Sequence, residues 1–214
     1  MAEAVRVGDL TDHSMPIDGA GSPDVNIGGQ KAWRAMPEGA GDGLDGPSKT
    51  VKEILDKVTV RPPEVMPKLP LIAADMAKVA ATAEAAGALG ATTIVATGFQ
   101  TLSATAIGLV ATYTAASAAP GAEPGAATAF TLAFQSALAQ TMTAAVQAIA
   151  GPWDMDSCKQ PGTTGPHGPG VVVKACKTVF INGLPAVVKG NQIIEATGGP
   201  STIKVGCGTV FIED

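Results

Sequence analysis

The stretch CKTVFI at residues 176–181 decides the fold, because it returns as CGTVFI at residues 207–212, 31 positions later. A more divergent copy, SPDVNI, occupies residues 22–27. Each copy is a short run of strand-forming residues bounded by Gly and Pro, which predicts strands joined by turns. One such repeat cannot bury its own apolar face, whereas three copies around an axis can. The copies therefore predict a small β-structure with pseudo-threefold symmetry; an ordinary β-meander with accidental similarity is the alternative.

The spacing of the copies shows where this unit is interrupted. The first and second copies are 154 residues apart, against 31 between the second and third, so 123 residues are inserted between them. The sequence thus predicts an α+β fold: a discontinuous β-repeat unit over residues 1–37 and 151–214, interrupted by an Ala-rich α-helical hairpin.

The inserted segment has two parts. Residues 38–70 are expected to form a linker, with a short helix beginning at the capping-box pattern of Thr50 and Glu53, followed by a Pro-rich extended spacer. Residues 71–150 are rich in Ala, Thr and Gly, and their larger apolar side chains recur at spacings of three and four. This pattern predicts two long helices, separated at the PGAEPG segment of residues 120–125 and folded back as a hairpin.

The sequence is compatible with two environments for the hairpin, a membrane and water. Its length suffices to cross a bilayer, and small residues allow close helix packing in membranes. The Gln and Thr residues along it favour the other reading, a soluble antiparallel pair whose narrow apolar stripes face each other or the β-unit.

Composition excludes some classes of function. The net charge of −5 and the lack of a Lys/Arg cluster argue against nucleic acid as a partner. Three cysteines cannot form a complete disulfide framework, and the N-terminal sequence has no secretory signal pattern, so folding in the cytoplasm is expected. We expect no enzymatic activity, because the chain has two histidines, and Ser14 beside one of them has no G-x-S-x-G context.

A metal site is the better chemical prediction. Cys158 and His167 flank a Gly/Pro-rich loop, and His13 precedes the first copy by nine residues, as His167 precedes the second. Zn²⁺ binds Cys sulfur and His nitrogen tetrahedrally and can stabilise a unit with a small core. We therefore predict zinc bound by His13, Cys158 and His167, with Cys207 as the fourth ligand. The alternative is that both histidines are loop residues making ordinary hydrogen bonds.

The chain resembles the PAAR-repeat proteins at its two ends. The resemblance is carried by VGDLTDH (residues 7–13), GSPDVNIGGQKAWR (21–34), GPHGPGVVVKACKTVFINGLPAVV (165–188) and GGPSTIKVGCGTVFI (198–212). AWR and PAVV stand where the family has its Pro-Ala-Ala-Arg signature. The resemblance covers roughly 100 residues and none of residues 38–150.

This resemblance implies a cone-like β-structure that caps the trimeric spike of a contractile injection machine, such as a type VI secretion apparatus or a related phage-like particle, and helps to pierce the target membrane. It also implies a metal near the vertex, and His13, Cys158 and His167 match those family positions. Such a protein would fold in the bacterial cytoplasm and leave the cell with the apparatus.

The threefold symmetry of such a spike leads us to expect one chain per trimer. Docking is expected through the alternately apolar repeat strands, at Val25, Ile27, Val179, Ile181, Val210 and Ile212. A second function remains open: a membrane-active effector or translocation module, in which the hairpin inserts into the target bilayer, with help from a chaperone, and the PAAR-like unit is the delivery handle.

Overall fold

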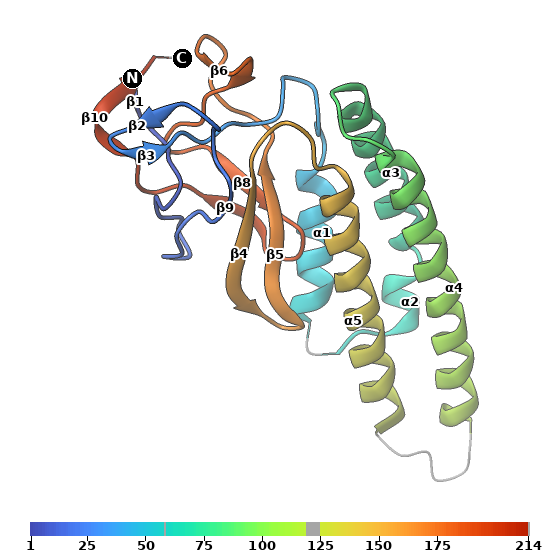
Figure 1. Cartoon of the computed structure of the whole chain (residues 1–214). Helices are drawn as coiled ribbons and strands as arrows, with labels where there is room; N and C mark the ends of the chain where they lie inside the picture. The colour runs from blue at the N-terminus through green and yellow to red at the C-terminus, as the bar shows by residue number, and fades with distance from the viewer. Residues whose placement is uncertain (58, 119–124, 214) are drawn as a thin grey trace.

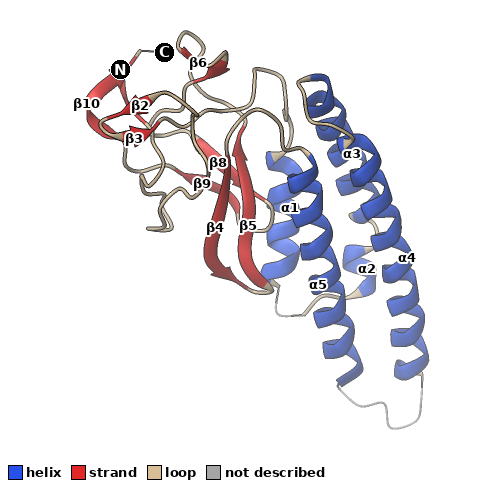
Figure 2. Ribbon diagram, in the orientation of Figure 1, coloured by secondary structure: helices blue, strands red, loops and turns tan. Residues whose placement is uncertain are grey.

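The computed structural model describes residues 1–57, 59–118 and 125–213. Strands and helices occupy two sides of the molecule, which confirms the mixed α+β class (Figures 1 and 2). Both chain ends lie in the strand-rich part, on the side away from the helices (Figure 1). Most of the break predicted at residues 120–125 lies outside the described residues.

The largest sheet is antiparallel and has the strand order β4-β5-β8-β9. Its strands are β4 (Met155–Gly162), β5 (Gly165–Val172), β8 (Gln192–Glu195) and β9 (Gly199–Thr202). β4 and β5 form a long hairpin in which Cys158 pairs with Gly168, and β5 continues the sheet by pairing Gly170 with Glu195. The hairpin and β8 thereby bring residues from both halves of the C-terminal segment together.

Two small ribbons carry the first two repeat copies. β2 (Asn26–Ile27) pairs with β3 (Gln30–Lys31), and β6 (Phe180–Ile181) pairs with β7 (Leu184–Pro185) in the same register. The two-residue turns between them, Gly28-Gly29 and Asn182-Gly183, have positive φ at both positions. This conformation suits a tight hairpin between twisted strands and favours Gly and Asn.

The third ribbon is assembled from the two ends of the chain. β10 (Cys207–Ile212) pairs with β1 (Ala2–Ala4), with Ile212 opposite Ala2 and Phe211 opposite Glu3. These pairs repeat the register of Ile27 with Gln30 and of Ile181 with Leu184. The N-terminal strand therefore supplies the return strand of the third copy.

A closed ring of backbone hydrogen bonds joins the three copies. Val5 N–H donates to Val187 C=O (2.9 Å), Val187 N–H to Trp33 C=O (3.1 Å), and Trp33 N–H to Val5 C=O (3.0 Å). The three side chains are each 1% exposed and share one small core. One residue from the neighbourhood of each copy thus takes part in the same cycle of backbone hydrogen bonds.

The insertion is more helical than predicted. It contains α1 (Asp45–Asp56), the short α2 (Pro62–Val65), α3 (Leu69–Ala85), α4 (Ala91–Ser117) and α5 (Gly125–Ala148). α4 and α5 are the two predicted helices. α3 was not predicted, and α1 begins five residues before the expected cap at Thr50. Prolines at the starts of α2 and α3 lie where a missing amide proton leaves no helical hydrogen bond unmade, so the Pro-rich segment does not prevent helices from forming.

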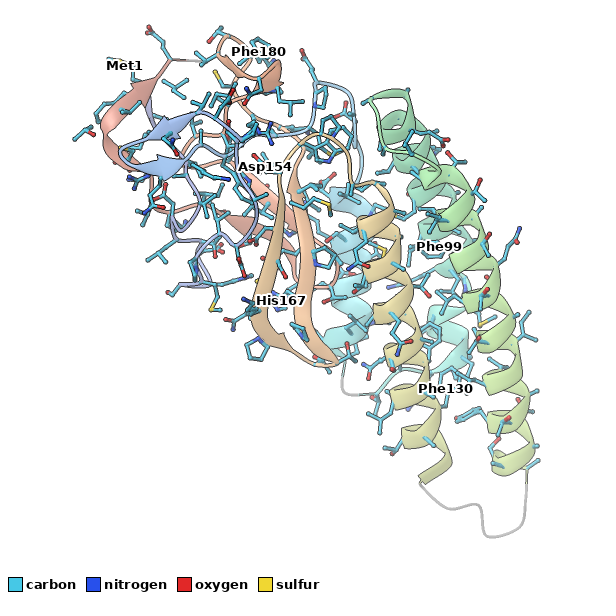
Figure 3. All side chains as sticks on the ribbon, viewed as in Figure 1. Met1, Phe99, Phe130, Asp154, His167 and Phe180 are labelled. Carbon is cyan, nitrogen blue, oxygen red and sulfur yellow. The ribbon has the colours of Figure 1, made fainter. Side chains whose placement is uncertain are left out.

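The helices pack in layers against the large sheet. α1 contacts β8 and β9, α5 contacts β5, and α3 and α4 cover α1 and α5 from outside (Figure 1). Phe99 of α4 and Phe130 of α5 lie in the helical layers (Figure 3). Sheet residues such as Val171 and Ile194 belong to the same core as these helices. The insertion therefore shares a core with the sheet.

Candidate metal centre

Three strand-borne side chains and one loop side chain converge at one end of the β-unit. Cys158 lies on β4, His167 on β5 and Glu195 on β8, on neighbouring strands of the large sheet. His13 reaches them from the loop that precedes Ile17. The loop is fixed by backbone hydrogen bonds from Thr11 to Met15 (3.0 Å) and from Asp12 to Thr202 (2.8 Å).

The four potential ligand atoms all lie within 4.8 Å of one another. Cys158 Sγ is 3.7 Å from His13 Nδ1, and His13 Nδ1 is 3.4 Å from Glu195 Oε1. His167 Nδ1 is hydrogen-bonded to Glu195 Oε2 at 2.7 Å. The two imidazole rings stand edge to face, with centroids 4.8 Å apart. The sequence correctly placed His13, Cys158 and His167 together.

Two of these separations match the edges of a tetrahedral site. Zinc–ligand bonds of about 2.0–2.3 Å at tetrahedral angles separate neighbouring ligand atoms by about 3.3–3.8 Å. The distances from His13 Nδ1 to Cys158 Sγ and Glu195 Oε1 lie within that range, whereas the His167–Glu195 contact is shorter because it is a hydrogen bond. The largest separation, up to 4.8 Å, exceeds such an edge, so binding of one cation by all four ligands would draw them closer together.

The electrostatics of the group also favour a cation. Glu195 is fully buried, and its Oε1 has no hydrogen-bond partner among the described residues. Burial and, to a smaller extent, the negative charge of Glu195 raise the pKa of the Cys158 thiol to about 12. Burial likewise raises the pKa of Asp156, on the same strand, to about 6. A buried carboxylate oxygen without a partner is costly, and a bound cation would remove that cost.

Glu195 was missed by the sequence analysis, although a signal was present. Gly198 is the third-copy equivalent of His13 and His167, since all three precede their repeat strands by nine residues. A Cβ at Gly198 would lie 2.0 Å from Glu195 Oε2 and 2.2 Å from His167 Nδ1. The third copy thus lacks a histidine, and the carboxylate of Glu195 fills the space that Gly198 leaves.

Cys207 is not part of this group, which corrects the predicted fourth ligand. It lies on β10 opposite Ala4, where its Sγ contacts the Thr209 hydroxyl at 3.3 Å. β10 and β1 lie near the chain ends, whereas the labelled His167 lies at the opposite end of the β-unit from Met1 and Phe180 (Figure 3). Cys207 therefore lies outside the group of His13, Cys158, His167 and Glu195.

Cys207 instead has a local structural role that all three copies share. The equivalent residues Ser22 and Cys176 are also buried, and each accepts the backbone N–H three residues ahead, from Val25 (3.1 Å) and Val179 (3.3 Å). All three are small side chains buried in the β-unit. Oxygen or sulfur at this position satisfies the backbone at the start of each repeat strand.

The predicted docking residues divide by exposure. Ile181 and Ile212 are 8% exposed and belong to a small core between the ribbons. Val25, Ile27 and Val210 are partly buried against that core, and Val179 is 37% exposed. The most exposed apolar side chains on the same strands are Phe180 (56%) and Phe211 (54%), which occupy equivalent positions in the second and third copies. A partner at this surface would contact the two phenylalanines before either isoleucine.

Comparisons with known proteins identify no relative. No family model, no curated protein and no solved structure matches the chain. Its function is inferred below from the geometry of the β-unit and of the candidate metal centre.

Proposed function

We propose that this chain is a PAAR-like spike tip, which caps the trimeric spike of a contractile injection apparatus and enters the target membrane first. The observation that carries this proposal is the hydrogen-bonded ring of Val5, Trp33 and Val187. A single chain with pseudo-threefold symmetry can present three similar surfaces to a threefold partner, so that one copy closes the spike axis. The role is structural, and it requires no catalytic group.

The two ends of the β-unit carry different groups, and we assign docking to one end and metal binding to the other. One end carries the three ribbons, with Phe180 and Phe211 exposed, and suits docking onto the apolar and backbone groups of spike strands. The other end carries the candidate metal centre on the β4–β5 hairpin and the His13 loop (Figure 3). A vertex of this kind has little core of its own, so cross-linking by a metal would stiffen it.

We further propose that the metal is Zn²⁺, bound by His13, Cys158, His167 and Glu195. A thiolate with two imidazoles is a donor set that favours zinc over magnesium or calcium, and four protein ligands leave no open position for substrate. When bound, the ion would supply folding energy by holding the loop and three strands together. The residues themselves position the site: β4, β5 and β8 fix three ligands, and the 8–17 loop brings the fourth.

Docking can be tested by native mass spectrometry of the chain co-purified with a trimeric spike protein. We expect three spike chains to one copy of this protein. The variant Phe180→Glu/Phe211→Glu should weaken the complex at least about tenfold, because it places two charges in an apolar contact. Leu89→Glu is the matched control, since Leu89 is 89% exposed but lies in the helical insertion.

A ratio of three to three, or tight binding to an isolated spike monomer, would contradict the proposed docking mode. If the Phe180→Glu/Phe211→Glu and Leu89→Glu variants weaken the complex equally, the ribbons do not form the docking contact.

A further inference from the structure

Helix α4 has an apolar outer face that the fold leaves uncovered. Among the described residues, it is the one helix long and apolar enough to cross a bilayer, yet only 22% of its most apolar stretch is buried. A core helix of a soluble protein would be mostly buried, and a signal sequence would lie near the N-terminus; α4 is neither. Ile94 (49% exposed) and Ile107 (61%) lie near the two edges of the exposed side of the helix, about 140° apart around its axis.

Several hydroxyl groups of α4 are hydrogen-bonded within the helix itself. The helix contains no Asp, Glu, Lys or Arg. The exposed hydroxyls of Thr101, Thr105 and Thr112 each donate to the carbonyl four residues earlier, at 2.9–3.0 Å. Such internal hydrogen bonds satisfy hydroxyl groups where no water is available. The exposed side chains of Thr93, Thr97 and Gln100 make no such bond with the described residues, so only part of the polar surface of α4 is suited to a medium that offers no hydrogen bonds.

Among the helices, the lack of charged side chains is confined to α4 and α5. α5, the packing partner of α4, also contains no acidic or basic residue. By contrast, α3 exposes the ion pair of Asp75 with Lys78, and α1 exposes that of Asp45 with Lys49. Charged side chains thus cover the outer surfaces of α1 and α3 and are missing from the α4–α5 pair.

We infer that the outer face of α4 is a lipid-contacting surface; entry of the whole α4–α5 pair into the hydrocarbon core of a bilayer would require α5 to leave α1 and β5, which it contacts in this structure. At 1.5 Å per residue, α4 is about 40 Å long and α5 about 36 Å, and both exceed the roughly 30 Å of a hydrocarbon core. Their lack of charge removes the main cost of insertion. This inference does not depend on the proposed spike partner, because it concerns the opposite side of the molecule.

The test is flotation of the purified chain with neutral phosphatidylcholine vesicles, which offer hydrocarbon without electrostatic attraction. We expect the chain to float with the vesicles and Ile107→Lys to lower the vesicle-bound fraction at least about tenfold, since lysine at a helix centre strongly opposes insertion. Leu71→Lys is the matched control, because Leu71 is 67% exposed but lies on α3, and it should bind as the unmodified chain does. Thr112→Lys, at another exposed position of α4, repeats the test if Ile107→Lys fails to fold.

Three results would overturn the inference. The first is an unmodified chain that stays with the lipid-free fraction. The second is an equal loss of binding in the Leu71→Lys control. The third is a lipid-free dimer that Ile107→Lys dissociates, which would identify a second copy of the chain as the occupant of this face.

Discussion

The hydroxyl of Ser48 on α1 donates a hydrogen bond to the backbone carbonyl of Glu195, the residue that completes the candidate metal centre. Both residues are fully buried, although 147 positions separate them. The helical insertion therefore contacts the backbone of a proposed ligand directly. The β-unit and the insertion are linked through this bond as well as through their common core.

Replacement of Ser48 tests this link. Ser48→Ala leaves a buried carbonyl without its side-chain donor, so we expect the free energy of unfolding to fall by about 1–3 kcal/mol. Urea unfolding measures this change. Thr50→Ala is the control, since the Thr50 hydroxyl bonds only within α1, to Gly46, and should cost much less. Equal losses in the two variants would show that the bond to Glu195 contributes nothing of its own.

The identity of the fourth ligand can be decided by two conservative variants. Protein purified without added metal should contain close to one zinc per chain by elemental analysis. Glu195→Gln keeps the shape of the side chain and removes its charge, so zinc affinity should fall at least about tenfold. Cys207→Ser should leave zinc content unchanged, because Cys207 is not part of the ligand group and its Sγ contacts the Thr209 hydroxyl. The opposite result would restore Cys207 as the ligand and exclude Glu195.

Removal of the metal should also destabilise the vertex. If zinc binds only the folded state, chelation will lower the melting temperature, and added Zn²⁺ will restore it. A melting temperature that does not respond to chelation, in a chain shown to contain zinc, would mean that the ion has no structural role.

The absence of a side chain at position 198 is predicted to be essential. In Gly198→Ala the new Cβ would lie 2.0 Å from Glu195 Oε2, so either the carboxylate or His167 must move. We expect a loss of about 1–3 kcal/mol in unfolding free energy and weaker zinc binding. Gly208→Ala is the control, because its Cβ would meet no atom within 4 Å. Unchanged zinc binding in Gly198→Ala would contradict the described ligand geometry.

The end of the insertion is fixed by a buried ion pair. Arg34 donates to both carboxylate oxygens of Asp154, at 2.7 Å from Nη2 and 3.0 Å from Nε. Asp154→Ala would leave a buried guanidinium without its counter-ion, at a cost of about 3–5 kcal/mol, measurable by denaturant unfolding. The exposed pair of Lys159 with Asp18 provides the comparison, and Lys159→Ala should cost less than about 1 kcal/mol. Similar costs for the two variants would show that burial adds nothing to the Arg34–Asp154 pair.

The elements predicted correctly are those with a local signal. The Gly28-Gly29 and Asn182-Gly183 segments specify tight turns, and apolar spacings of three and four specify α4 and α5, because both depend on residues that are neighbours in sequence. The structure of the first half of the insertion was predicted less accurately. Proline was taken as a helix breaker in residues 61–70, whereas at a helix start it is tolerated, and α3 begins there.

What the sequence by itself determined is the set of repeats, the length of the insertion and three members of the metal group, His13, Cys158 and His167. The two histidines follow from their equivalent positions nine residues before a copy, whereas Cys158 was predicted because it and His167 flank one Gly/Pro-rich loop. Only the tertiary structure decided that Glu195 joins them, that Cys207 lies elsewhere, and that β1 completes the third copy. These outcomes depend on which side chains become neighbours across long separations in sequence, as where Gly198 leaves room for a carboxylate from an adjacent strand.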